Sequence, residues 1–216
     1  MSGPALFEVA LPYLPPEAAV QVRDLCGLWP VDLRIARPRR SKLGDHRPPS
    51  GPWPRHRISI NSDLNPWAFL TTLLHEFAHA ATWERHRRRR LRPHGEEWRR
   101  EFTALLRPVV DAGTLPADIE AALRGTLERP AAATCTDRAL LLALAHYDGR
   151  DDGRVRVERL ETGTLFRLDD GHVLRAGPLL RTRRRCFERR SGREYRVHGL
   201  LLVEPLADGP RGPASR

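Results

Sequence analysis

The segment His75-Glu76-Phe77-Ala78-His79 constrains this chain more than any other feature of its sequence. Two histidines four residues apart on a helix point the same way, so both imidazoles can bind one metal ion. A glutamate beside the first histidine then lies within reach of a metal-bound water molecule and can accept its proton. Zinc hydrolases use this arrangement, because the zinc ion lowers the pKa of the water that it binds.

The residues around this segment predict the helix that the chemistry requires. Asn65 offers a capping side chain, and Pro66 stands at the first helical position, where its missing N–H is harmless. At about 100° per residue, one face collects large apolar side chains, and the histidine face collects small ones. That separation favours a metal site over the alternative of two ordinary histidines on an amphipathic helix. We therefore predict a zinc-binding helix over residues 66–84.

A third metal ligand is expected, because catalytic zinc usually has three protein ligands and one open position. Arg85 stands six residues after His79, where one familiar arrangement has a histidine, and arginine cannot bind the ion. If the helix continues, His86 lies about two turns, roughly 10 Å, farther along the helix axis than His79 and is too distant to bind the same metal ion. The candidates in this region are His86, His94, Glu96 and Glu97.

Among these candidates, we choose His94. Pro93 stops the first helix, and Gly95 allows a sharp reversal into a second helix predicted over residues 95–107. A histidine at the start of a returning helix can complete the set of ligands. The returning chain reaches the histidine pair only if the first helix ends within about residues 83–90.

Further motifs accompany the histidines. The zinc helix is preceded by Ser41-Lys42-Leu43-Gly44 and Ile58-Ser59-Ile60-Asn61, and a basic interval leads to Pro93-His94-Gly95-x-x-Trp98. Over residues 30–107 the chain resembles the SprT-like metallopeptidases, which include the Spartan proteases of DNA–protein crosslink repair. The resemblance implies a zincin-like helical domain, one Zn²⁺ bound by His75, His79 and His94, Glu76 as general base, and a peptidase role linked to DNA.

The cysteines depart from the pattern of many relatives, which carry a C-terminal zinc ribbon built from paired cysteines. This chain has Cys26, Cys135 and Cys186, and no Cys-x-x-Cys segment. A second, structural zinc site is therefore not expected. The DNA-binding role of the ribbon in those relatives is not transferred to this chain.

The net charge of +10 makes polyanions natural long-range partners. Two arginine clusters concentrate the charge, one between the second and third proposed ligands and one over residues 181–190. The first cluster can form a track for DNA beside the active site, or simply a solvated loop, and both interpretations stay open. Its candidate nucleic-acid-binding residues are Arg85, Arg87, Arg88, Arg89, Arg90 and Arg92.

The pattern along the chain predicts an α+β fold. We expect a SprT-like metallopeptidase domain over residues 1–130, a connecting helix over 131–148, a small antiparallel β region over 149–206 and a disordered tail over 207–216. The β region could instead extend the sheet of the first domain. Further predicted elements are a helix over 15–27, strands over 31–36 and 57–61, a loop over 37–55, and helices near 116–125 and 134–147.

No apolar run approaches the ~20 residues that span a bilayer, and the N-terminus lacks the features of a secretory signal. We therefore expect a cytoplasmic protein with no membrane partner. The leading hypothesis is a zinc-dependent endopeptidase that acts on proteins near or on DNA. The alternatives are a nucleic-acid-binding module with a structural or vestigial zinc site, and a peptidase unrelated to DNA. Glu76 discriminates, because a structural site has no need of that carboxylate.

Overall fold

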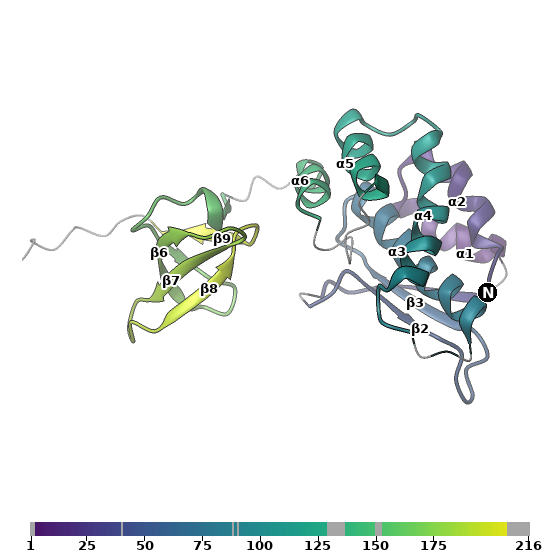
Figure 1. Cartoon of the computed structure of the whole chain (residues 1–216), viewed down its shortest axis with the longest axis horizontal. Helices are drawn as coiled ribbons and strands as arrows, with labels where there is room; N and C mark the ends of the chain where they lie inside the picture. The colour runs from purple at the N-terminus through teal and green to yellow at the C-terminus, as the bar shows by residue number, and fades with distance from the viewer. Residues whose placement is uncertain are drawn as a thin grey trace, which may run out of the picture. The chain divides into compact units, whose positions relative to one another are not determined.

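The computed structural model describes residues 3–39, 41–87, 89, 91–128, 137–149 and 153–206. The chain divides into two compact units, residues 1–149 and 150–216 (Figure 1). The first combines helices with a small sheet and the second is built mainly of strands, so the predicted α+β class is confirmed. Within the described residues, no helix combines the length and the apolar character needed to cross a membrane.

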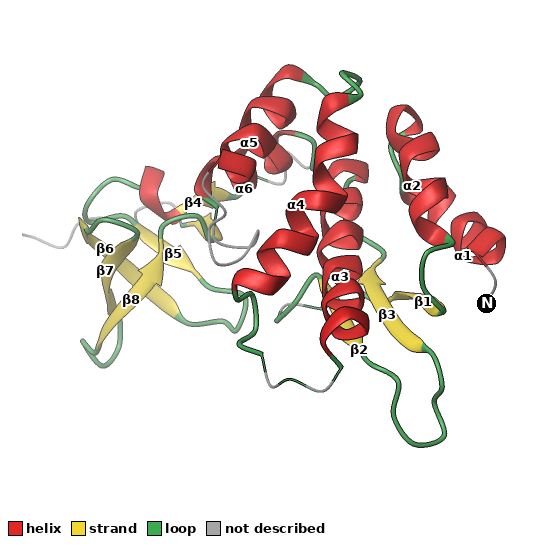
Figure 2. Ribbon diagram, turned by 45° about the vertical axis from the view of Figure 1, so that its right-hand side comes forward, coloured by secondary structure: helices red, strands yellow, loops and turns green. Residues whose placement is uncertain are grey.

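The first unit contains a three-stranded sheet with helices packed on it (Figure 2). The strands are β1 (Val31–Ala36), β2 (Gly44–Arg47) and β3 (His56–Asn61). The central strand, β3, pairs in parallel with β1 and antiparallel with β2, which therefore lies at an edge. The alternating sequence of β1 and the buried isoleucines of β3 give this sheet an apolar face that the helices cover.

The longest helix, α3 (Pro66–His86), begins as its sequence predicts. The side chain of Asn65 accepts a hydrogen bond from the backbone N–H of Ala68, and Pro66 is the first helical residue. Phe69, Leu73 and Phe77 are fully buried, so α3 passes through the centre of the core. The other helices are α1 (Gly3–Ala10), α2 (Ala19–Cys26), α4 (Glu96–Asp111), α5 (Ala117–Glu128) and α6 (Arg138–His146).

Three local predictions need correction. Residues 37–55 are not a continuous loop, because their proline-free centre forms the edge strand β2. The helix predicted over 15–27 consists of a 3₁₀ turn (Pro16–Ala18) followed by α2. The returning helix α4 continues through Pro108 to Asp111, since burial of two valines in that last turn outweighs the backbone hydrogen bond lost at proline. The helix α1 has no counterpart among the predicted elements.

The second unit is a six-stranded antiparallel sheet in the order β4-β9-β5-β6-β7-β8, so it does not extend the first sheet. Beneath it, the buried guanidinium of Arg184 donates hydrogen bonds to the carbonyl groups of Gly177 and Val157, at 2.7 and 2.9 Å. The tail predicted over 207–216 lies outside the described residues. The strands are β4 (Val155–Arg156), β5 (Leu165–Arg167), β6 (Val173–Leu179), β7 (Arg183–Glu188), β8 (Glu194–His198) and β9 (Leu202–Pro205).

Candidate metal centre

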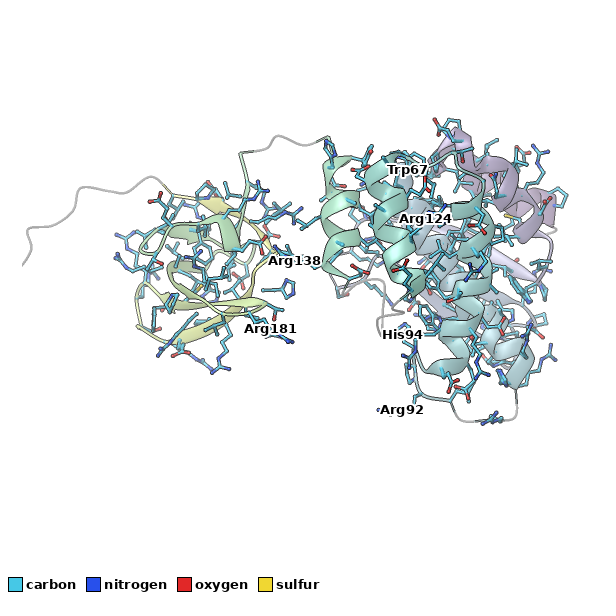
Figure 3. The ribbon with its side chains drawn as sticks, turned by 45° about the horizontal axis from the view of Figure 1, so that its top comes forward. Trp67, Arg92, His94, Arg124, Arg138 and Arg181 are labelled. Carbon is cyan, nitrogen blue, oxygen red and sulfur yellow. The ribbon has the colours of Figure 1, made fainter. Side chains whose placement is uncertain are left out.

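Three imidazoles converge at the junction of α3 and α4. The Nε2 atom of His79 lies 3.2 Å from that of His75 and 3.1 Å from that of His94, and the third separation is 3.0 Å. His75 and His79 come from successive turns of α3. His94, labelled in Figure 3, comes from the loop that leads into α4. The structure therefore brings together the three residues that the sequence proposed as metal ligands.

The arrangement of the three nitrogens fits a metal ion. Three nitrogens bound at 2.0–2.1 Å around a tetrahedral zinc ion lie about 3.4 Å apart, close to the separations found here. Burial, together with the neighbouring histidines, lowers the pKa of His75 to about 3 and that of His79 to about 4. These imidazoles are therefore neutral near pH 7, as metal ligands must be. Three lone pairs directed at one point are stabilised by a cation in their midst.

The chain reverses between the two helices as the site requires. α3 ends at His86, inside the predicted interval of residues 83–90. His94 adopts a left-handed backbone conformation with φ of 55°, and the N–H of Gly95 donates to the carbonyl oxygen of Arg92 at 2.9 Å. This turn points the His94 side chain back toward α3.

The indole of Trp98 supports all three imidazoles. Its ring centroid lies 4.7 Å from those of His75 and His94 and 5.4 Å from that of His79. Phe102 stacks behind it at 5.0 Å, one turn farther along α4. These buried aromatic rings restrict the rotamers of the histidines and so preorganise the site.

Glu76 follows His75 in α3. Its side chain is 6% exposed, and burial, with a further contribution from Asp45, raises its pKa to about 8. Gly44 of β2 lies directly against this carboxyl group: a Cβ atom at Gly44 would stand 2.9 Å from the Glu76 Cδ atom. The absence of a side chain at that position leaves the carboxyl group room beside the strand.

A cavity of about 370 Å³ opens beside Glu76, and we call it the α3 cavity. One wall is the segment Ser41–His46, which includes the start of β2, and another is formed by three leucines of α6. Neither wall is evident from the sequence, because both are brought to α3 by contacts between distant segments. The residues that line it are Ser41, Lys42, Leu43, Gly44, Asp45, His46, Thr71, Thr72, His75, Glu76, His79, His94, Leu140, Leu141 and Leu144.

A second histidine pair, which sequence reasoning also missed, extends from the α3 cavity. His46 Nε2 lies 2.9 Å from His56 Nδ1, and His56 Nε2 lies 3.0 Å from the Glu84 Oε1 atom. The ring of His46 lies parallel to that of His79 at 5.9 Å. Although burial acts to raise the pKa of Glu84, hydrogen bonds from Arg87 and His56 hold it below its usual value. Because Glu84 is ionised, its Oε1 atom accepts a hydrogen bond from the Nε2–H group of His56. In a neutral His56 the Nδ1 atom then carries no hydrogen, so it accepts a hydrogen bond from the Nε2–H group of His46.

The arginine run that begins in the last turn of α3 is partly neutralised by carboxylates. Arg85 pairs with Glu101 at 3.0 Å, and Arg89 lies 3.7 Å from Glu97. Arg87 Nε donates to Glu84 at 3.0 Å. These pairs bind the start of the loop to α3 and α4. Arg92 is exposed, and the proposed residues Arg88 and Arg90 lie outside the described part of the chain.

The remaining candidate ligands have other positions. His86 is in the last turn of α3 and lies outside the group of three histidines. Glu96 forms an ion pair with Arg100 on the surface of α4, and Glu97 faces Arg89. The choice among the four candidates thus agrees with the geometry around His94.

Residues 39–117 match the model of the SprT-like family. This match supports SprT-like family membership for that part of the chain. The SprT-like segment contains the three histidines, Glu76 and β2, together with the whole of α4. Comparisons with curated proteins and with solved structures gave no match.

Proposed function

We propose that the first unit is a zinc-dependent endopeptidase. The observation that carries this proposal is the convergence of the three histidine Nε2 atoms beside the buried carboxyl group of Glu76. Zinc held by His75, His79 and His94 would supply a Lewis acid that acidifies water and polarises a carbonyl group. SprT-like membership and the HExxH spacing support this assignment.

Glu76 has the position and the environment of a general base. It accepts a proton from the attacking water molecule and then donates that proton to the leaving amine of the cleaved peptide bond. Its raised pKa, about 8 in the absence of a cation, favours holding the proton between these two steps. A cation held by the three histidines would lower this value and make the carboxylate form available before attack.

The surroundings favour a catalytic site over the alternative of a structural zinc site in a binding module. Structural zinc is usually enclosed by four protein ligands. Among the described residues, the group at this site comprises three histidines, and the α3 cavity opens next to it. A closed structural site also does not require a buried carboxyl group such as that of Glu76 beside its ligands.

The edge strand β2 offers a means of holding an extended substrate. It pairs with β3 on one side and lines the α3 cavity. A peptide lying along its other side adds a strand to the sheet through main-chain hydrogen bonds, which do not depend on sequence. The carbonyl groups of the bound peptide then pass close to the three histidines.

A direct test is cleavage of an unfolded protein such as casein by the purified, zinc-loaded chain. Cleavage should stop with a chelator, return with zinc, and be lost in Glu76→Gln. Binding of one zinc per chain with no cleavage of any protein tested would support the binding module instead.

We further propose that DNA-associated proteins are among the substrates. The supporting observation is the charge of the second unit: residues 153–206 contain thirteen arginines against seven acidic residues. Arg185 and Arg196 stand opposite each other on the exposed face of β7 and β8, with Arg183 next along that face. Glu194 lies 2.8 Å from Arg185 and 4.0 Å from Arg196, and its single charge offsets only part of theirs. Like charges in direct opposition are unfavourable until a polyanion neutralises them.

DNA binding is measured by fluorescence anisotropy over a range of salt concentrations, because phosphate contacts give a steep salt dependence. Replacement of Arg183, Arg185 and Arg196 by glutamine should weaken binding and remove any stimulation of cleavage by DNA. Equal cleavage of free and DNA-bound protein, with no effect of these changes, would favour a peptidase unrelated to DNA.

A further inference from the structure

The α3 cavity is apolar where α6 lines it, near the N-terminus of α3, and we call this part its apolar end. Leu140, Leu141 and Leu144 of α6 form one side there, and Leu43 contributes from the segment before β2. Leu140 and Leu144 are buried and Leu141 is half-buried. The apolar side chains therefore extend from the core of the unit to the cavity.

The two threonines on the α3 side do not make this end polar. Thr71 donates its hydroxyl hydrogen to carbonyl oxygens of its own helix, with Trp67 and Ala68 at 3.0 and 3.1 Å. Thr72 donates in the same way to Ala68, at 2.7 Å. With these hydroxyls turned to the backbone, the threonines can present their methyl groups to a ligand.

The helix that carries the leucines is fixed at both ends. At its start, Thr126 of α5 donates to the Oδ2 atom of the N-cap residue Asp137, at 2.9 Å. At its end, the amide of Asn65 donates to the carbonyl oxygen of Leu144 at 2.9 Å. The ring of Tyr147 also packs edge-on against Trp67. The apolar wall is thus held to the N-terminus of α3, the helix that carries Glu76.

From these contacts we propose that the apolar end of the α3 cavity is a specificity subsite for one apolar side chain of a protein substrate, of leucine to phenylalanine size. This inference rests on the proposed peptidase function, because the subsite lies beside the proposed position of the scissile bond. A volume of about 370 Å³ is at the small end of ligand sites, which suits one side chain and its adjoining backbone. A charged side chain there loses its hydration without gaining a partner.

The test is digestion of a peptide library by the zinc-loaded chain, with cleavage sites identified by mass spectrometry. At one position next to the cleaved bond, we expect leucine, methionine and phenylalanine to be preferred. For matched peptides, leucine should give a kcat/KM at least about 10-fold higher than alanine or aspartate. Cleavage with no preference at either flanking position would overturn the subsite while leaving the peptidase function intact.

Introducing a negative charge into the pocket gives a sharper comparison. In Leu141→Glu the preference should move from apolar to lysine and arginine side chains. The matched control is Leu142→Glu, since Leu142 is the next residue of α6, is also half-buried and is not among the residues that line the cavity. The same preference in wild type and Leu141→Glu would contradict the proposal. Should Leu141→Glu not fold, Leu141→Ala should lower the preference for leucine over alanine.

Binding separates failure of the subsite from failure of the peptidase. In Glu76→Gln loaded with zinc, fluorescence anisotropy measures the affinity of labelled peptides that differ at one flanking residue. Tighter binding of the leucine peptide than of the aspartate peptide supports the subsite even if no peptide is ever cleaved. Equal affinities, with cleavage by the wild type, would show that the leucines only complete the core.

Discussion

Gly44 and Glu76 are packed so closely that β2 and α3 admit no side chain between them. A Cβ atom on Gly44 would stand 2.9 Å from the Cδ atom of Glu76 and 2.7 Å from the Cγ2 atom of Thr72. Both separations are below van der Waals contact. The position of the proposed base therefore depends on a glycine in a different element of the fold.

We predict that Gly44→Ala lowers peptidase turnover by about 100-fold, because it displaces the Glu76 carboxyl group. Zinc content should stay at one per chain, since the atoms nearest to the new methyl group belong to Glu76 and Thr72 and not to the histidines. Gly125→Ala is the control, because Gly125 lies in α5 with open space around it. Turnover in Gly44→Ala equal to that of this control would show that the close contact between Gly44 and Glu76 does not affect catalysis.

The second prediction concerns Glu76 itself. Glu76→Gln should retain zinc, because the side chain is not a proposed ligand, and should lose at least about 100-fold in turnover through loss of the base. Metal analysis and kinetics on the same preparation check both parts. Turnover that survives with the zinc intact would remove Glu76 from the mechanism.

The same substitution has a distinct signature in the metal-free protein. The pKa of Glu76 is about 8 in the folded state, above its ordinary value of 4.5. The stability that Glu76 contributes is thus complete below pH 4.5 and is lost as the pH rises through 8. Glutamine does not titrate, so the free energy of unfolding of Glu76→Gln should rise relative to wild type between pH 5 and 8. Denaturant titrations at several pH values measure this difference.

A third prediction distinguishes His94 from the nearby His86. His94→Ala removes one of three nitrogens and should weaken zinc binding by at least about 100-fold. His86→Ala should leave the zinc affinity unchanged, because that residue lies outside the convergent group. Competition with a chromogenic chelator gives both affinities. Equal losses in the two variants would show that His94 is not the third ligand.

The fourth prediction addresses the pair His46 and His56. His56 is fully buried between His46 and Glu84, and His56→Leu removes the hydrogen bond that it makes with each of them. We expect a loss of about 1–3 kcal/mol in the free energy of unfolding. His146→Leu is the comparison: its imidazole also faces a carboxylate, at Asp118, but is exposed and should cost much less. A loss no larger than in this comparison would contradict the role of burial.

The sequence predicts the parts of the site whose determinants are local. The start of α3 is predicted by Asn65 and Pro66, and its length by the helical periodicity of large apolar and small side chains. Pro93 and Gly95 mark the reversal of the chain at His94. By contrast, β2 has four residues among prolines, and its pairing with β3 supplies the stability that its own sequence lacks. For the same reason the sequence pattern assigns His46 to a loop.

The leucines of α6 show a different limit. Their helix is predicted near residues 134–147, but no local pattern reveals that it packs at the N-terminus of α3. The hydrogen bonds from Thr126 to Asp137 and from Asn65 to Leu144 determine that placement. The second joins residues that are 79 positions apart in the sequence, and contacts of that kind leave no periodic pattern in a sequence.

The position of α6 also places catalysis and the choice of cleavage site in different segments of the chain. The family match ends at residue 117, after the histidines, the glutamate and the edge strand, whereas the leucines that close the apolar end begin at Leu140. The residues proposed to break a peptide bond and the helix proposed to choose which bond are therefore encoded in different stretches of the gene. Exchange of residues 118–149 between relatives would redirect such an enzyme to new sequences without disturbing its chemistry.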